Sequence, residues 1–334
     1  FDRNSRFIYG GTTTYPHLDN DIGDEIVNDF LNKKMNEPWM FYSHLMDLKD
    51  PTVWAKEYDD IKFGKTVYDR NLSALDKWIG KFLEKIDLTN TLFIITTDHG
   101  EYVLPQSNDI EKSIRKVSGI GKKSQVLGSI GKKPFALSLK IAKKIKQNKI
   151  ENLDESIKRN YYLSRASTEL YDDLIRVPLL FIGHGIKEPK KILKQTRHID
   201  IFPTIFELIE EKVSDSSIDG RSNVPLIKDQ KMDDLPVYIE TGSKSPREIG
   251  KVVGIRTSNY KYFRSRDNPK DGVNLYDLKN DPNEENNIQD EILIKKMEDM
   301  LLEIINKSES SVKNEITDDE AQKLEEELRK MGYI

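Results

Sequence analysis

The sequence predicts an α/β fold, a mostly parallel sheet flanked by helices, with a small C-terminal α+β subdomain. Short apolar runs typical of buried strands alternate with stretches of helical periodicity, and this alternation favours parallel layers. After about residue 235, short β-rich runs separated by turn residues favour a small antiparallel sheet. We therefore expect an α/β core over 1–232, interrupted by a basic insert at 105–168, and a C-terminal subdomain over 233–334.

The first predicted elements are a strand and a helix. The run PWMFYSHL (38–45) is apolar and rich in aromatic residues, and the turn-like DLKDP (47–51) follows it, so we expect a buried strand. Between 65 and 86, apolar residues recur at the spacing of one helical face and predict an amphipathic helix. They are Val67, Leu72, Leu75, Ile79, Phe82, Leu83 and Ile86.

Later runs predict the remaining elements. The apolar runs 91–97 and 177–183 predict buried strands, and IDIFPTIFELIEEK (199–212) predicts a helix. At the start of this helix, we expect His198 and Asp200 to position the helix rather than to bind metal. In the C-terminal region, PVYIET, KVVGIRT, YKYFR and then NLYDLKNDPNEENNI precede two charged helical stretches.

The composition limits the classes of protein. The chain has 334 residues, of which 37% are hydrophobic and 33% charged, enough for a large core and about two domains. No apolar run approaches the roughly 20 residues of a membrane span, and no leader with a small-residue cleavage site opens the sequence, so we expect a soluble protein. The absence of cysteine excludes a disulfide framework, a thiolate zinc site and a cysteine nucleophile within these residues. The cellular compartment stays open.

A strongly basic segment interrupts the α/β pattern. Between Lys112 and Lys149 there are eleven lysines and one arginine but no aspartate or glutamate. In FALSLKIAKKIKQ (135–147), apolar residues fall near one helical face and lysines around the rest. We expect a mobile lid or docking surface that faces an anionic membrane surface or a polyanionic substrate, and no nucleic-acid partner. The alternative is a solvated helix whose apolar stripe packs on the protein.

The strand predicted at 91–97 ends on Asp98, His99 and Gly100. In open parallel sheets, ligands bind beyond the carboxyl ends of the strands. A carboxylate and a neutral imidazole are good ligands for a divalent cation, neighbours on a tight turn can reach one ion, and Gly100 would allow a close backbone approach. The simpler interpretation is that Asp98 caps the next helix and His99 is a hydrogen-bonded residue at the sheet edge.

Five segments in the same order resemble the sulfatase family, within the alkaline phosphatase superfamily. TNTLFIITTDHGE (89–101) resembles the family's metal-binding strand end. ELYDDLIRVPLLFIGHG (169–185) and TRHIDIFPTIFELI (196–209) resemble the segments that follow it. GIRTSNYKYFR (254–264) and NLYDLKNDPNEENNI (274–288) resemble its C-terminal subdomain. Because five motifs agree in order over most of the chain, the sequence is identified as a member of this family.

The resemblance implies a metal-dependent hydrolase of sulfate esters. Asp98 and His99 would bind one divalent ion, Ca²⁺, Mg²⁺ or Mn²⁺, which polarises the ester and activates the nucleophile. In the family, that nucleophile is a formylglycine made from cysteine, or a serine or threonine. FDRNSRFIYGG (1–11) resembles a part of the family's sequence that lies past the nucleophile. We therefore expect the core to be incomplete at its N-terminus, with the catalytic nucleophile and the other ligands in a preceding segment.

The resemblance also implies two substrate-binding residues. SHLMDLKDP (43–51) resembles a family motif with two histidines; His44 matches the first, and Lys49 stands at the second. A lysine there would attract an anionic ester but would not serve as a tunable acid. The alternatives are a core histidine and an exposed turn lysine. The family's loop histidine has no counterpart in SRASTELYDD (164–173).

The reaction leaves alternatives open, because sulfuryl and phosphoryl groups share tetrahedral shape and anionic oxygens. The substrate would be an anionic ester, a sulfated or phosphorylated glycan or lipid. The protein could instead hydrolyse phosphate or phosphonate esters, transfer a phosphate-linked head group, or bind anionic glycans without turnover. The nucleophile separates these possibilities: cysteine favours sulfate, threonine favours phosphoryl transfer, and an inert residue favours binding alone.

Overall fold

The structure is a computed structural model. Apart from a few single residues near the two ends of the chain, it describes residues 38–49, 53, 55–103, 169–212, 218–241 and 251–311. The chain divides into two compact units, residues 1–85 with 102–165 and residues 86–101 with 166–334. The basic insert predicted at 105–168 lies outside the described residues, and the domain boundary at 232/233 stays a prediction.

The first unit contains the predicted amphipathic helix, α2 (Val67–Leu83). Its N-terminus is fixed by a capping box, in which Thr66 Oγ1 accepts the N–H of Asp69 and Asp69 Oδ2 accepts the N–H of Thr66. The buried face includes Leu75 and Phe82, as predicted, together with Trp78, whereas Leu72 is 46% exposed. Among the described residues before α2 there are three single-turn 3₁₀ helices: η1 (Asp47–Lys49), η2 (Lys56–Tyr58) and η3 (Ile61–Phe63).

The buried strand predicted at 38–45 is wrong. These residues have no regular secondary structure, and Met40 and Tyr42 are 79% and 72% exposed. Phe41 stacks on Phe82 of α2, with ring centroids 5.7 Å apart. A short apolar run indicates burial but does not distinguish a strand from an irregular segment, and this run lacks the alternation that would have decided.

In the second unit, the predicted strands β1 (Leu92–Thr96) and β2 (Leu179–Gly183) form an antiparallel ladder, with Leu92 opposite Gly183. Our expectation of parallel pairing is wrong for these two strands. Alternation of strands and helices does not fix direction when the connection is long, because such a connection can deliver the second strand either way. That the wider core sheet is mostly parallel stays a prediction.

In the described residues after β2, the chain forms short helical elements. The chain passes through η4 (His198–Asp200) into α7 (Ile201–Leu208), and α8 (Val224–Ile227) comes after it. Asp200 is 2% exposed; its carboxylate accepts hydrogen bonds from the Arg197 guanidinium (2.6 Å) and from the backbone N–H groups of Arg197 (3.1 Å) and Arg221 (3.0 Å). Asp200 thus positions the start of the helix, as predicted.

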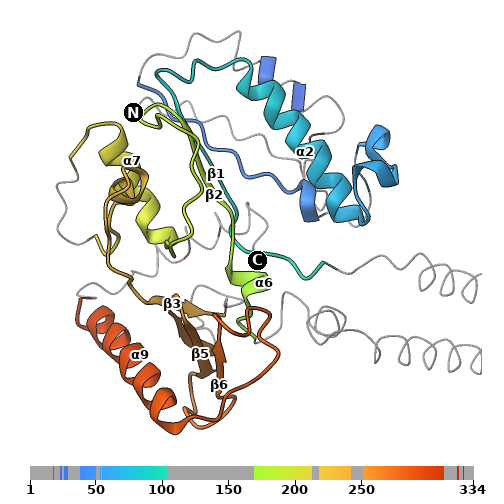
Figure 1. The fold of residues 1–334 in the computed structure, drawn as a ribbon. Helices are drawn as coiled ribbons and strands as arrows, with labels where there is room; N and C mark the ends of the chain where they lie inside the picture. The colour runs from blue at the N-terminus through green and yellow to red at the C-terminus, as the bar shows by residue number, and fades with distance from the viewer. Residues whose placement is uncertain are drawn as a thin grey trace, which may run out of the picture. The chain divides into compact units, whose positions relative to one another are not determined.

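Among the described residues of the C-terminal region, four strands form an antiparallel sheet in the order β3-β4-β5-β6, and α9 lies along it (Figure 1). The elements are β3 (Val237–Glu240), β4 (Val252–Arg256), β5 (Tyr260–Ser265), β6 (Asn274–Asp277) and α9 (Glu291–Ser311). The core between sheet and helix consists of Val253, Ile255, Tyr262, Leu275, Met297 and Leu301. The antiparallel pairing agrees with the sequence pattern, whereas a separate subdomain with the predicted bounds stays a prediction.

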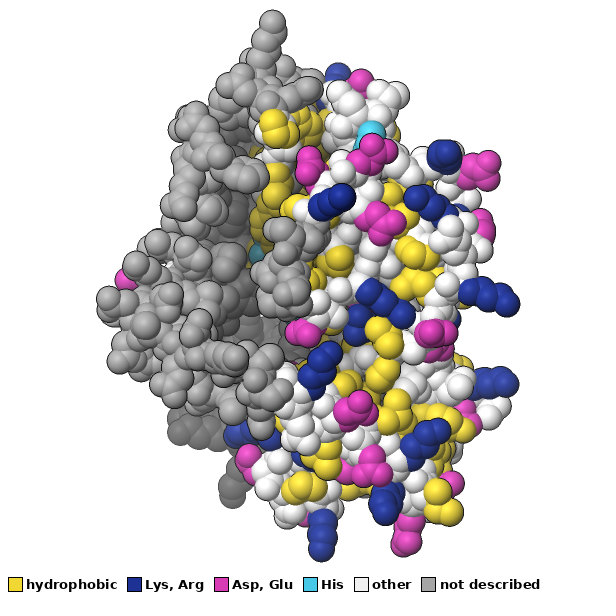
Figure 2. All heavy atoms as spheres, turned by 90° about the vertical axis from the view of Figure 1, so that its left-hand side faces the viewer, with side chains coloured by type: hydrophobic (Ala, Val, Ile, Leu, Met, Phe, Trp, Pro, Cys, Tyr) yellow, Lys and Arg dark blue, Asp and Glu magenta, His cyan; other side chains and the backbone are white. Residues whose placement is uncertain are grey.

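The surface of the described part carries both signs of charge. On the face that Figure 2 shows, Lys and Arg side chains are interspersed with Asp and Glu side chains. The positive excess between Lys112 and Lys149 therefore belongs to a segment outside the described residues. A search of the described helices finds none that combines the length and the apolar character of a membrane span.

Candidate active site

The turn that follows β1 brings the two predicted metal ligands together. Asp98 Oδ1 accepts the backbone N–H of His99 at 2.9 Å, and Asp98 Oδ2 lies 3.6 Å from His99 Nε2. The side chains of Asp98 and His99 are 40% and 43% exposed, so neither is packed into the core. One carboxylate oxygen and one imidazole nitrogen thus stand side by side at the end of a strand.

The orientation of the His99 ring suits a metal ligand. Its Nδ1 lies 2.7 Å from the carbonyl oxygen of Gly100, which can only accept. In the neutral ring this hydrogen bond assigns the proton to Nδ1 and leaves a lone pair on Nε2, the arrangement that metal-binding histidines commonly show.

The donor set fits a divalent cation in part. Two ligands of one ion, each about 2.0–2.5 Å from it, stand about 3–4 Å apart, and the gap between Oδ2 and Nε2 falls in this range. The described residues contain no group of three or more metal-ligating side chains. Among the described residues, Asp98 and His99 therefore form only part of the coordination sphere that a bound ion would need.

Gly100 brings the turn against a second element, α6 (Asp172–Ile175). The N–H of Gly100 donates to the carbonyl oxygen of Leu174 at 2.7 Å. A Cβ atom at position 100 would lie 2.0 Å from the carbonyl oxygen of Asp173, a distance that backbone atoms cannot accommodate without moving. Glycine at this position is thus required by a close backbone approach, as the sequence indicated.

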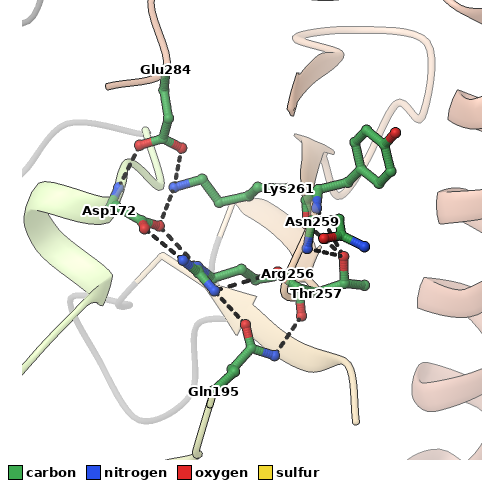
Figure 3. A network of polar contacts seen from close by, with 8 residues as sticks. Asp172, Gln195, Arg256, Thr257, Asn259, Lys261 and Glu284 are labelled. Carbon is green, nitrogen blue, oxygen red and sulfur yellow. Dashed lines mark hydrogen bonds and ion pairs between the residues drawn. The ribbon is translucent and has the colours of Figure 1, made fainter. Parts of the chain in front are cut away.

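A buried ion network holds the first residue of α6 (Figure 3). The Asp172 carboxylate accepts from Arg256 Nε at 3.0 Å, from Arg256 Nη2 at 2.7 Å and from Lys261 Nζ at 2.9 Å. The backbone N–H of Asp172 donates to Glu284 Oε2 at 2.7 Å, and Lys261 Nζ also pairs with Glu284. Gln195 Oε1 accepts from Arg256 on the other side of the guanidinium. The charges of two carboxylates and two cations therefore compensate each other around the backbone of Asp172.

Burial and charge act against each other in this network. Burial raises the pKa of Asp172, but the hydrogen bonds and charges of Arg256 and Lys261 outweigh it and lower the pKa to about 2. Burial raises the pKa of Glu284 despite the nearby Lys261, and burial lowers the pKa of Lys261 despite both carboxylates. The side chains of Lys261 and Glu284 are 0% and 1% exposed, so these charges depend on one another rather than on water.

We predict a specific pH dependence for the variant Asp172→Asn. Because the folded pKa of Asp172 lies below its ordinary value of 3.8, the stability it contributes is present above about pH 4 and is lost as pH falls toward 2. The difference between 3.8 and about 2 corresponds to about 2 kcal/mol. Urea unfolding between pH 2 and 6 should show that the difference in unfolding free energy between wild type and variant shrinks by about this amount toward low pH. A difference that is constant over this range would contradict the prediction.

His198, which we expected only to position the helix that follows it, also contacts the end of β1. Its Nε2 is 3.4 Å from Thr96 Oγ1 at the end of β1, and Thr96 Oγ1 donates to the carbonyl oxygen of Pro178 at 2.9 Å. The two residues are 102 positions apart, so only the fold joins them. The sequence offers no signal for this contact.

The two predicted substrate-binding residues belong to the first unit. His44 is partly buried just before η1, and Lys49 is the last residue of η1. Their position relative to Asp98 and His99 stays a prediction. The described residues thus assemble the turn of Asp98, His99 and Gly100 and its contact with α6, while the substrate contacts remain expectations.

Comparison with known proteins identifies two family regions. The family model described as Sulfatase matches residues 3–211, and the model described as N-sulphoglucosamine sulphohydrolase, C-terminal, matches residues 164–311. Among curated relatives, Delta 4,5-hexuronate-2-O-sulfatase of Bacteroides thetaiotaomicron is 32% identical over 124 residues, which cover 35% of this chain and 25% of that protein. Arylsulfatase K of Gallus gallus is 26% identical over 158 residues, which cover 43% of this chain and 29% of that protein.

Comparison with solved structures gives matches with TM-scores below 0.5. A putative sulfatase from Bacteroides thetaiotaomicron gives a TM-score of 0.46 at 16% identity, covering 90% of this chain and 54% of that one. A structure described as a complex with its substrate D-glucosamine-2-N,6-O-disulfate gives a TM-score of 0.48 at 20% identity, covering 74% of this chain and 42% of that one. The chain spans about a quarter of the length of the curated relatives that it matches. Because the sulfatase model matches more than half of its residues, the chain belongs to the sulfatase family of the alkaline phosphatase superfamily.

Proposed function

We propose that the full-length protein is a metal-dependent hydrolase of sulfate esters in which Asp98 and His99 supply two ligands to a divalent ion, Ca²⁺, Mg²⁺ or Mn²⁺. The observation that carries the proposal is the pairing of Asp98 Oδ2 with His99 Nε2 at 3.6 Å, on a glycine turn at the end of β1. The resemblance of TNTLFIITTDHGE (89–101) to the family's metal-binding strand end also supports the proposal.

Each residue of the turn has a separate task in this proposal. Asp98 supplies negative charge and an oxygen ligand, and His99 supplies a neutral nitrogen whose direction is fixed by the Gly100 carbonyl. Gly100 supplies the close packing on α6 that holds both. When bound, the ion would polarise the ester oxygens and activate the nucleophile.

The substrate we propose is a sulfated sugar. The bacterial relative is named for a sulfate ester on a hexuronate, and this name supports a sulfated sugar as the substrate. We assign His44 and Lys49 to the substrate anion, Lys49 as an electrostatic contact whose attraction weakens with salt.

The test is an assay of the full-length protein on sulfated glycosaminoglycan oligosaccharides and, in parallel, on phosphorylated sugars. After treatment with a chelator, sulfate release is expected to stop, and adding Ca²⁺, Mg²⁺ or Mn²⁺ is expected to restore it. Phosphate release that exceeds sulfate release would favour the phosphoesterase alternative. Binding of the sulfated oligosaccharide without sulfate release would favour a protein that binds glycans only.

A further inference from the structure

The ion network and the metal turn meet on the same four-residue helix. Asp172, the centre of the network, is the first residue of α6, and Leu174, whose carbonyl oxygen binds the N–H of Gly100, is the third. A shift in the backbone at Asp172 therefore displaces the carbonyl group that Gly100 contacts. The Asp173 carbonyl oxygen, against which Gly100 packs without space for a Cβ atom, lies between these two residues.

The network anchors α6 to the antiparallel sheet of the second unit and to Glu284. Arg256 is the last residue of β4, and Lys261 lies in β5, in the middle of the antiparallel sheet. Glu284 receives the backbone N–H of Asp172 itself, so the main chain is held as well as the side chain. Residues of β4, of β5 and of the segment after β6, all distant from Asp172 in the sequence, thus fix its position.

Stability alone is a poor reason for such a network. Buried ion pairs lose much of their attraction to desolvation, and replacing them with well-packed apolar residues is often neutral or stabilising. Their best-attested role is to fix one arrangement among several. In this unit, the arrangement that is fixed is the contact between α6 and the Asp98 turn.

We propose that Asp172 is a positioning residue for the metal turn: the network fixes α6, and α6 fixes Gly100 and with it the ligands Asp98 and His99. This inference rests on the proposed function, because it takes Asp98 and His99 as metal ligands. Residues that orient metal ligands from behind commonly change metal affinity by 10- to 100-fold when they are substituted.

The test compares two matched variants of the full-length protein, Asp172→Asn and Glu298→Gln. Glu298 is also a carboxylate in an ion cluster of the second unit. It accepts from Arg264 Nη2 at 2.8 Å and from the Tyr262 hydroxyl at 2.9 Å, and both of these partners lie in β5 rather than in α6. Calorimetric titration of the metal-free proteins with Mn²⁺ alone is expected to show at least about a 10-fold loss of affinity in Asp172→Asn. Glu298→Gln is expected to stay within about 2-fold of wild type.

A second readout needs no metal. Hydrogen exchange of the Gly100 amide reports the hydrogen bond to Leu174, so exchange should be faster in metal-free Asp172→Asn and unchanged in Glu298→Gln. If Asp172→Asn folds poorly, Arg256→Lys replaces it in both measurements. This variant keeps the positive charge but loses the bidentate contact, so it should show a smaller loss of Mn²⁺ affinity and a smaller increase in the exchange of the Gly100 amide.

The outcomes separate the two proposals. If Asp172→Asn and Glu298→Gln lose affinity for Mn²⁺ equally, or if neither variant loses affinity, the positioning role is overturned. A variant Asp98→Asn that binds Mn²⁺ as tightly as wild type would overturn the proposed metal site, and the exchange of the Gly100 amide would still decide whether Asp172 holds the turn.

Discussion

The variant Asp98→Asn is expected to lower sulfate-ester hydrolysis by the full-length protein by about 1,000-fold. The amide keeps the shape of the side chain but removes the negative charge that balances a divalent ion. A bound metal supplies several kcal/mol of transition-state stabilisation, and about 4 kcal/mol corresponds to this factor. The measurement is kcat/KM for sulfate release from the same sulfated oligosaccharide, together with the temperature of thermal unfolding.

The matched control for this variant is Asp76→Asn, an Asp-to-Asn change on the exposed side of α2. Both variants should unfold within about 2 °C of wild type, because neither change removes a buried contact of the core. Activity of Asp98→Asn within a few-fold of Asp76→Asn would show that Asp98 does not serve the reaction.

The variant Lys261→Met is expected to cost about 3–5 kcal/mol of unfolding free energy at pH 7. The change retains most of the buried volume but leaves the carboxylates of Glu284 and Asp172 without their shared cation, and an uncompensated buried charge is among the most destabilising changes in a protein core. Urea unfolding gives the difference as a shift of the midpoint at constant slope.

An exposed lysine supplies the control. Lys270 lies in the turn between β5 and β6, and Lys270→Met should change the unfolding free energy by no more than about 0.5 kcal/mol. A loss below about 1 kcal/mol for Lys261→Met would mean that the two carboxylates find a proton or another partner, and that the network is not interdependent.

The elements that the sequence predicted well are those with a strong periodic signal. The helix α2 has an apolar face and a capping box written in consecutive residues, and the C-terminal strands have short runs bounded by turn residues. The failures have local causes. The run 38–45 is apolar but lacks the alternation of a strand. The direction of β2 relative to β1 depends on the path of the long connection between them, and a sequence pattern does not predict that path.

The candidate site also contains residues that the sequence predicted and residues that it did not. Asp98 and His99 are neighbours in the chain, so covalent connection alone keeps them close, and a resemblance to known motifs gave them a role. The partners of Asp172 were different: Arg256 and Glu284 lie 84 and 112 positions away. Charged residues in a single sequence are ordinarily expected at the surface, and pattern alone does not pair them across such separations.

The hydrogen bond from Gly100 to Leu174 also closes a long stretch of chain. Once the two ends of a segment are pinned, its length has little effect on the free energy of closure, since each doubling costs only about 0.6 kcal/mol. The segment from Glu101 to Tyr171 could therefore change in length at little cost in closure free energy, provided that Asp172 and Leu174 keep the contacts that hold the turn of Asp98 and His99. Under the proposed function, a change in the length of this segment would then leave the proposed metal ligands Asp98 and His99 in place.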